Sequence, residues 1–283
     1  MVRRTRLDAE LVRRGLARSR DHAARLVEAR RVSIRGVLAS KPATAVEPDA
    51  ALLVREESTG PDWVSRGAPK LLGALDRFEP AGLPVDGRRC LDAGASTGGF
   101  TEVLLHRGAR EVVAVDVGYG QLAWRLRTDP RVQVHDRTNI RAVSSDAIGG
   151  PADLVVADLS FISLRLVLPV LLACTAAGGD LVPMVKPQFE VGRERLGSGG
   201  VVRDPRLRTD AVLAVVGVAA ELGLGLRDVV ASPLPGPSGN VEYFLWLRAG
   251  VTGSGVTGLG VTGLGVTGSP DELVRAAVAE GPR

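Results

Sequence analysis

The sequence has few of the residues from which disulfide frameworks, metal sites and aromatic cores are built. Its 283 residues include 2 cysteines, Cys90 and Cys174, 3 dispersed histidines and only 4% aromatic residues. The two cysteines lie far apart and form no Cys/His cluster, so we expect neither a disulfide framework nor a bound metal. A core with so few aromatic side chains has to be built from Val, Leu and Ala.

Long apolar runs are missing as well. No stretch reaches roughly 18 consecutive apolar residues, the length that a membrane-spanning helix needs. The segment MVRRTRLDAELVRRG starts with basic residues, but no apolar stretch of the kind found in secretory leaders follows them. With 45% hydrophobic and 24% charged residues, the composition is typical of a globular protein. We expect a cytoplasmic monomer that does not contact membranes.

Charge is distributed unevenly along the chain. Residues 1–55 contain 13 Lys and Arg against 6 Asp and Glu, a net charge of +7, whereas the remainder carries a net −3. A basic segment ahead of a slightly acidic body indicates a polyanionic partner such as nucleic acid. An ordinary solvated surface explains the same charge, so charge alone does not decide between the two.

The first 57 residues have the pattern of a small α+β domain. Apolar residues between Leu7 and about Arg30 recur at helical spacing with a break near 15–19, which predicts two short helices, the second capped by Ser19. Residues 32–36 alternate as a strand does and end at a glycine turn, and 51–54 can pair back onto them. We place a domain at 1–57 and a linker at 58–66, where Gly60-Pro61 interrupts any regular element.

Residues 67–250 alternate between apolar strand-like runs and helical segments, which predicts a mostly parallel sheet covered on both faces. The expected strands are 90–93, 112–115, 132–134, 154–157 and 181–185, and the expected helices are 70–78, 100–107, 121–127, 164–174 and 206–222. Two further strands, 226–231 and 241–247, are joined by a connection too short for a helical crossover, so they pair antiparallel. A parallel sheet that ends in such a hairpin is typical of S-adenosylmethionine-dependent methyltransferases.

The end of the chain has a different composition. Residues 251–268 repeat VTG(S/L)G with a period of five, which predicts a flexible tether. Behind it, Ser269-Pro270-Asp271-Glu272 has the pattern of a capping box. We therefore expect a short carboxyl-terminal helix within 269–283.

A glycine-rich turn, LDAGASTGGF, connects an expected strand to an expected helix at 91–100. Its glycines allow the backbone to approach a ligand closely, and a helix amino terminus offers free N–H groups. Asp116 ends the next strand, where a carboxylate can bind ribose hydroxyls. The pattern G-x-S-x-G-G predicts a nucleotide-type cofactor, with an NAD(P) site or a turn without ligand as alternatives. The candidate cofactor-binding residues are Gly94, Ser96, Thr97, Gly98, Gly99, Asp116 and Asp136.

Lysine is rare, because 33 of the 36 basic residues are arginine. A buried lysine can lose its proton and act as a general base, whereas arginine stays protonated. Lys186 follows the run 181–185 and Asp158 follows 154–157, so both lie at strand carboxyl ends, where open α/β sheets have their active sites.

Two further charged residues complete this group. Lys70 begins the helix before the first strand, and Glu242 lies in the late strand 241–247. Each of the four has an ordinary structural explanation, as a loop cation, a helix cap, an edge-strand charge or a solvated helix residue. Their expected location at one end of the sheet favours a shared site.

Over about residues 3–248, the chain resembles the TlyA-type, haemolysin-A-like ribosomal RNA 2′-O-methyltransferases. The segments that carry the resemblance are RRGLARSR, VSRGAPKL, LDAGASTGGFTEVLL, DVGYGQLAW, DLVVADLSFISL, VPMVKPQFEVG and PLPGPSGNVEYF. The resemblance implies an S4-type RNA-binding domain followed by an FtsJ-like methyltransferase domain. It also implies S-adenosylmethionine as cofactor and the 2′-hydroxyl of a cytidine in 16S and, for some members, 23S ribosomal RNA as substrate.

The family also has a catalytic Lys-Asp-Lys-Glu tetrad, which falls here on Lys70, Asp158, Lys186 and Glu242. In the mechanism that we infer, Lys186 takes the 2′-hydroxyl proton, Asp158 orients Lys186, and Glu242 holds the ribose or the second lysine. Contacts with RNA phosphates are expected from arginines of the first domain, namely Arg6, Arg13, Arg14, Arg18 and Arg20.

Two residues depart from the family pattern. Arg30 stands where S4 domains usually have a turn glycine, and Pro69 directly precedes Lys70, so that the helix is expected to begin there. Three other functions remain as alternatives: a non-catalytic RNA-binding protein on a methyltransferase scaffold, a membrane-active haemolysin, and an NAD-dependent oxidoreductase.

Overall fold

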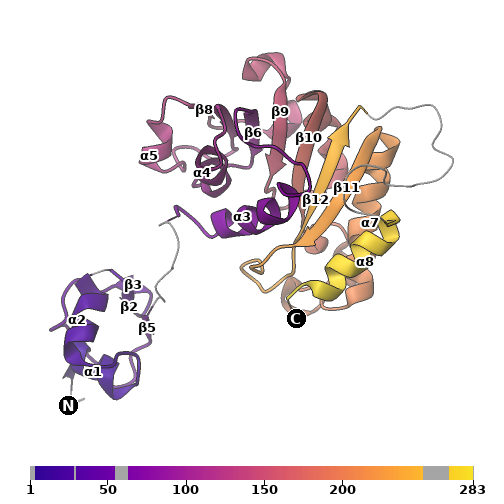
Figure 1. Ribbon diagram of the computed structural model, residues 1–283. Coiled ribbons are helices and arrows are strands. Elements are labelled where there is room, and N and C mark those ends of the chain that lie inside the picture. Colours follow the sequence, from indigo (N-terminus) through magenta and orange to yellow (C-terminus); the bar gives the residue numbers. More distant parts are fainter. Residues whose placement is uncertain (1–3, 29, 55–62, 251–267, 283) are drawn as a thin grey trace. The chain divides into compact units, whose positions relative to one another are not determined.

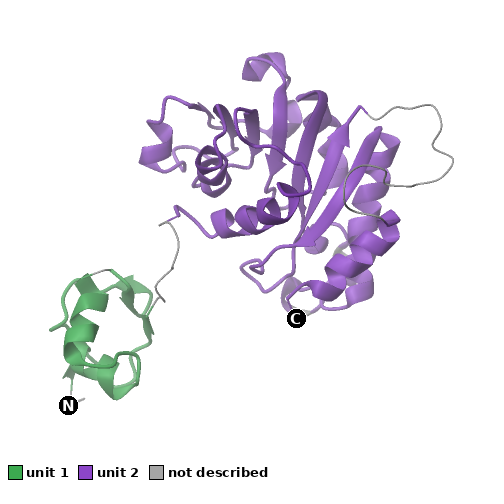
Figure 2. Cartoon of the chain, viewed as in Figure 1, with its two compact units in different colours: residues 1–62 green, residues 63–283 purple. Residues whose placement is uncertain are grey.

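The computed structural model describes residues 4–28, 30–54, 63–250 and 268–282. The chain divides into two compact units, residues 1–62 and 63–283 (Figure 2). The expected tether at 251–268 lies almost entirely outside the described residues, as do positions 58–62 of the expected linker. Positions 63–66 pack onto the second unit: Trp63 makes an edge-to-face contact with His106, and the Val64 N–H donates to Glu102.

The first unit is a small α+β fold, as expected. Its elements are β1 (Thr5–Arg6), α1 (Leu7–Arg13), α2 (Arg20–Glu28), β2 (Val32–Ile34), β3 (Val37–Leu38), β4 (Ala45–Val46) and β5 (Leu52–Val54). Strand β2 pairs antiparallel with both β3 and β5. The Ser19 hydroxyl accepts the His22 N–H at 3.1 Å, which confirms the predicted cap of α2. Leu7, Leu11 and Ala23 form the centre of a core of its own.

Arg30 occupies the turn between α2 and β2 in a left-handed conformation, with φ of +56°. Its N–H donates to the Val27 carbonyl at 2.9 Å, so the turn forms with arginine at this position. A non-glycine residue in this region costs about 1–2 kcal/mol. The departure from the family pattern therefore adds strain and leaves the turn intact.

The second unit contains one seven-stranded sheet. Its strands are β6 (Arg89–Ala93), β7 (Glu111–Val115), β8 (Val132–His135), β9 (Ala152–Ala157), β10 (Thr175–Val185), β11 (Leu224–Ala231) and β12 (Tyr243–Ala249). They lie in the order β11-β12-β10-β9-β6-β7-β8. Strands β6 to β10 run parallel, while β12 is antiparallel to both β10 and β11. The expected parallel sheet with an antiparallel final hairpin is confirmed.

Helices cover both faces of this sheet (Figure 1). They are α3 (Gly67–Phe78), α4 (Gly99–His106), α5 (Trp124–Arg127), α6 (Leu168–Ala173), α7 (Pro205–Glu221) and α8 (Pro270–Glu280). Side chains of α3 and α4 pack into one hydrophobic cluster, and those of α6, α7 and α8 pack into another. Each cluster includes alternate residues of the same strands, which explains why the strands are apolar almost without interruption.

Three local expectations need correction. Helix α3 begins at Gly67, where the N–H donates to the Ser65 hydroxyl, and it accommodates Pro69 in its first turn, where no intrahelical N–H bond is lost. Helix α5 begins at Trp124 and not at 121, because the extended Ala123 gives its N–H to the Thr97 carbonyl. Strand β10 begins at Thr175, six residues before the expected start.

The carboxyl-terminal helix has the predicted capping box, in which Ser269 and Glu272 exchange hydrogen bonds with each other's backbone N–H. Within the described segments, no helix is long and apolar enough to cross a membrane. The same segments contain no group of three or more His, Cys, Asp and Glu side chains placed to hold a metal ion.

Candidate functional site

The candidate residues gather at one edge of the sheet. Because parallel strands all end at the same edge, the residue after each strand lies there. These residues are Gly94 after β6, Asp116 after β7, Asp136 after β8, Asp158 after β9 and Lys186 after β10. Strand β12 runs the opposite way and starts at this edge, immediately after Glu242. Glu242 therefore precedes its strand and does not lie within it, and that strand is internal.

The glycine-rich turn brings the β6–α4 connection against the neighbouring strand end. A Cβ at Gly94, whose φ is +88°, would lie 2.5 Å from the Asp158 carbonyl oxygen. Gly98 has φ of +99°, and a Cβ there would strike the side chains of Leu122 and Leu126. Both positions need glycine for conformation and for space. The backbone of residues 94–99 forms a turn, called the glycine cradle below, that ends at Gly99, the first residue of α4.

Asp116 organises the outer part of this cradle. Its two carboxylate oxygens accept the N–H of Ser96 at 2.9 Å and of Gly118 at 2.6 Å. An ionised carboxylate has about four acceptor positions, so two remain for hydroxyl donors. Asp136 is more heavily occupied, because one oxygen accepts the Gly120 N–H at 3.2 Å and lies 2.9 Å from the Arg127 guanidinium.

Asp92 is a functional candidate that sequence reasoning missed. Its side chain is fully buried in β6, where Oδ2 accepts the Thr101 hydroxyl at 2.7 Å and Oδ1 finds no hydrogen-bond partner among the described residues. Burial raises the pKa of Asp92 to about 7, and the nearby Asp158 carboxylate adds to the effect. The signal was available in the phrase LDAG, where one acid interrupts an otherwise apolar strand.

Lys186 and Asp158 form a close pair at the edge of the sheet. The Lys186 Nζ lies 2.5 Å from Asp158 Oδ1 and 3.0 Å from the hydroxyl of Ser160. The Lys186 side chain is 10% exposed and that of Asp158 is 25% exposed, so the pair is partly accessible to solvent. Ser160 had not been singled out, since a serine in a loop carries no distinctive pattern.

Lys70 and Glu242 form a second pair that is almost closed to solvent. The Lys70 Nζ lies 2.6 Å from Glu242 Oε2, with side-chain exposures of 8% and 1%. Val185 of β10 pairs with Tyr243 of β12, so Lys186 and Glu242 are the next residues along two adjacent strands. The four charged residues thus form two ion pairs on neighbouring strand ends, with one pair buried and the other accessible.

An exposed aromatic residue stands beside the accessible pair. Phe161, directly after Ser160, is 91% exposed and has a φ of +63°. Its ring centroid lies 5.3 Å from that of Phe189, which follows Lys186 by three residues. A bulky side chain rarely adopts positive φ, and such strain concentrates at functional sites. Its position after a strand end was the available signal, but the strain was not visible in the sequence.

The arginines expected to bind RNA are largely engaged within the first unit. Arg6 and Arg20 contact the buried carboxylate of Asp8, whereas Arg13 and Arg14 share that of Glu10. Arg14 also donates to the carbonyls of Pro48 and Ala50. The side chain of Arg18 forms no hydrogen bond or ion pair with any residue in the described part of the chain. The side chains of Arg6, Arg13 and Arg20 remain 53–61% exposed, whereas that of Arg14 is 23% exposed.

Comparison with known proteins places these features in a family. The family described as FtsJ-like methyltransferase matches residues 63–249, and the S4 domain matches residues 5–52. The chain is 60% identical over 282 residues to the 16S/23S rRNA (cytidine-2′-O)-methyltransferase TlyA of Mycobacterium tuberculosis, covering 100% of both chains. It is 33% identical to Hemolysin A of Brachyspira hyodysenteriae, over 84% of this chain and 97% of that protein.

A solved structure agrees over the full length. A protein of Streptococcus thermophilus named as a hemolysin superimposes with a TM-score of 0.69 at 34% identity, covering 99% of this chain and 98% of that one. The glycine cradle, the two ion pairs and the amino-terminal unit therefore lie in segments that match known families.

Proposed function

The chain belongs to the FtsJ-like methyltransferase family and carries an S4 domain, and from this premise we propose that it methylates the 2′-hydroxyl of a cytidine in 16S and 23S ribosomal RNA. The observation that carries the proposal is the pairing of Lys186 with Asp158 at 2.5 Å, beside the cradle formed by Gly94. The activity stated in the name of the 60% identical relative supports this choice of substrate. Since ribosomal RNA is the substrate, the reaction takes place in the cytoplasm.

The residues of the cradle fit S-adenosylmethionine. At Gly94 and Gly98 a Cβ would strike Asp158 or the leucines of the following loop and helix, so glycine lets this turn pack closely at the end of the sheet. Asp116 keeps acceptor capacity for the two ribose hydroxyls of the cofactor. Ser96, Thr97 and Gly99 form the turn itself. Asp136, after β8, accepts the N–H of Gly120 in the loop that follows Asp116. The cofactor, when bound, supplies an electrophilic methyl group on a sulfonium.

Lys186 handles the proton of the substrate hydroxyl. In its neutral form, Nζ would accept the 2′-hydroxyl proton while the oxygen forms its new bond to the methyl group. The electron pair of the broken S–CH₃ bond would stay on sulfur, which would leave as a neutral thioether. Asp158 then stabilises the resulting ammonium and keeps Nζ at a fixed place on the edge of the sheet. General base catalysis of this kind contributes about 10²–10⁴-fold, and alignment of the reacting atoms supplies more of the acceleration.

The Lys70–Glu242 pair lies in the interior of the protein and supports the neighbouring strand end that carries Lys186. With almost no access to solvent, it positions the start of β12 next to Lys186 and has little room to contact a ribose directly. We therefore assign Glu242 to holding the second lysine, which is one of the two roles expected for it. Phe161 offers an exposed face on which the base of the target nucleotide can stack.

The S4 domain supplies phosphate contacts that do not read sequence. Arg18 is the residue with the most freedom for this role, while Arg6, Arg13 and Arg20 offer the outward part of guanidiniums already anchored on Asp8 or Glu10. Arg14 contributes chiefly to the fold of the domain.

Labelled methyl transfer tests the proposal. Purified small and large ribosomal subunits, and free ribosomal RNA, would be incubated with methyl-tritiated S-adenosylmethionine, and the RNA would then be hydrolysed with alkali. Label in an alkali-resistant dinucleotide supports 2′-O-methylation and identifies the position. A protein that binds the cofactor and transfers no methyl group to any of these RNAs would contradict the proposed activity and favour a non-catalytic RNA-binding role.

A further inference from the structure

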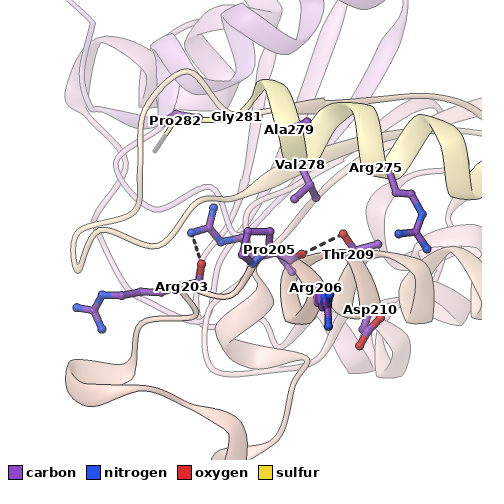
Figure 3. Close-up of a pocket in the computed structure, with 11 residues that line it drawn as sticks. Arg203, Pro205, Arg206, Thr209, Asp210, Arg275, Val278, Ala279, Gly281 and Pro282 are labelled. Atoms are coloured by element: carbon purple, nitrogen blue, oxygen red, sulfur yellow. Dashed lines mark hydrogen bonds between the residues drawn. The ribbon is translucent and has the colours of Figure 1, made fainter.

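A cleft outside the site described above lies between α7 and α8. Its volume is about 870 Å³. The residues along it come from the start of α7 and the end of α8 (Figure 3), and they include Arg203, Arg206, Arg208, Asp210 and Arg275. The lining has four arginines and one carboxylate, and Asp271 outside the lining pairs with Arg275, so the cleft keeps a net positive charge.

The cleft opens at the catalytic edge of the sheet. Val202, three residues before the start of α7 at Pro205, donates its N–H to the Asn240 side chain at 2.9 Å, so α7 begins near Glu242 at that edge. At the end of α8, a Cβ added to Gly281 would lie 3.1 Å from Ala231 and 3.4 Å from Val241, the neighbour of Glu242. Both walls of the cleft are therefore connected to segments that carry catalytic residues.

The arginines of the cleft are held to different degrees. Arg208 donates to the carbonyls of Val202 and Arg203, and Arg275 is paired with Asp271. Arg206 lies in the exposed first turn of α7, and its guanidinium forms no hydrogen bond or ion pair with any residue in the described ranges. Figure 3 shows Arg206 close to Asp210 on the α7 side, with Arg275 on α8. A fixed arginine frame with one uncommitted guanidinium suits an anion that arrives from solution.

We propose that this cleft binds the phosphate backbone of the RNA that flanks the target nucleotide. The inference rests on the proposed function, because the RNA strand whose ribose reaches Lys186 has to continue along the same edge. Arginine binds phosphate oxygens in a bidentate manner, and such contacts position a strand without reading its sequence. Helix α8, whose Val274 and Ala277 are buried, then forms one wall of the cleft that the RNA occupies.

Neutralising the uncommitted arginine tests the proposal. Arg206→Gln is expected to raise the KM for ribosomal RNA roughly three- to tenfold, and to reduce the slope of log(kcat/KM) against log salt by about 0.7–0.9, the contribution of one phosphate contact. Arg206→Lys retains the charge, so its KM and its salt slope should lie close to the wild-type values. In all variants kcat and the cofactor Kd stay at the wild-type value, because Arg206 does not touch the reacting atoms.

Arg110→Gln is the matched control. Arg110 is an exposed arginine directly before β7, hence at the opposite edge of the sheet, and its neutralisation should leave both KM and salt slope unchanged. An Arg206→Gln variant that matches Arg110→Gln in both quantities would overturn the proposal. If the wild-type protein transfers no methyl group to RNA, the proposed function fails by itself. In that case the salt dependence of direct RNA binding by the same variants tests whether the cleft binds RNA.

Discussion

The buried pair of Lys70 and Glu242 should be a major determinant of the stability of the second unit. Lys70→Met leaves a carboxylate with 1% exposure without its partner at 2.6 Å, and Glu242→Gln leaves an ammonium with 8% exposure in the same position. Breaking a buried ion pair by removing one partner costs about 3–5 kcal/mol. A domain has about 5–15 kcal/mol of total stability, so each single variant loses a large part of it.

The assay is thermal and chemical unfolding of the single variants, the double variant and a surface control. For a unit of this size, 3–5 kcal/mol corresponds to a decrease in Tm of about 6–20 °C. The double variant Lys70→Met/Glu242→Gln should lose much less than the sum of the two single losses, because it contains no unpaired buried charge. Arg275→Gln removes an exposed pair with Asp271 and should cost less than about 1 kcal/mol. Single variants as stable as this control, or losses that simply add in the double variant, would show that the buried pair does not stabilise the unit in this way.

Three further results are expected. Gly94→Ala should sharply reduce methyl transfer and lower Tm, because its Cβ meets the Asp158 carbonyl at 2.5 Å. The control Gly82→Ala has a φ of +105° and open space around the added Cβ, so it should lower stability and leave activity unchanged. Equal activities of the two variants would contradict the close approach at Gly94. The raised pKa of Asp92, about 7 against 3.8, means that the folded state retains a proton that the unfolded state releases. Stability should therefore decrease as pH rises from about 4 to 7, and Asp92→Asn should flatten this part of the profile in denaturation curves; an unchanged profile would speak against the assignment. Phe161→Ala should raise the KM for RNA by roughly 5–150-fold, the range for a lost base–aromatic stack, with Phe161→Trp near the wild type; an unchanged KM would exclude stacking.

The arrangement of the strands could be predicted because their signals are local and repeated. Apolar runs separated by helical segments specify a parallel sheet, and the residues that follow these runs have to meet at one edge. Lys186, Asp158 and Asp116 were found by this reasoning. Lys70 was singled out because lysine is rare in this sequence, and the family resemblance then placed it in the tetrad.

What the sequence did not reveal depends on tertiary contacts. The pairing of the four charged residues into one buried and one accessible pair follows from the register of β10 with β12, which no local pattern encodes. The same holds for Asp92, whose isolation results from packing against α4, and for the strained exposed conformation of Phe161. The arginines of the first unit show the opposite case: their number indicated RNA binding, but Asp8 and Glu10 engage most of them, which only the folded domain makes visible.

The most direct test of the account is single-turnover methyl transfer to ribosomal RNA by Lys186→Met and Lys186→Arg, with cofactor affinity measured by calorimetry. Arginine can keep the ion pair with Asp158 but cannot accept a proton. Both variants are expected to bind S-adenosylmethionine as the wild type does and to lose about 10²–10⁴-fold in rate. A Lys186→Arg variant that retains the wild-type rate would contradict the role of Lys186 as the group that removes the 2′-hydroxyl proton.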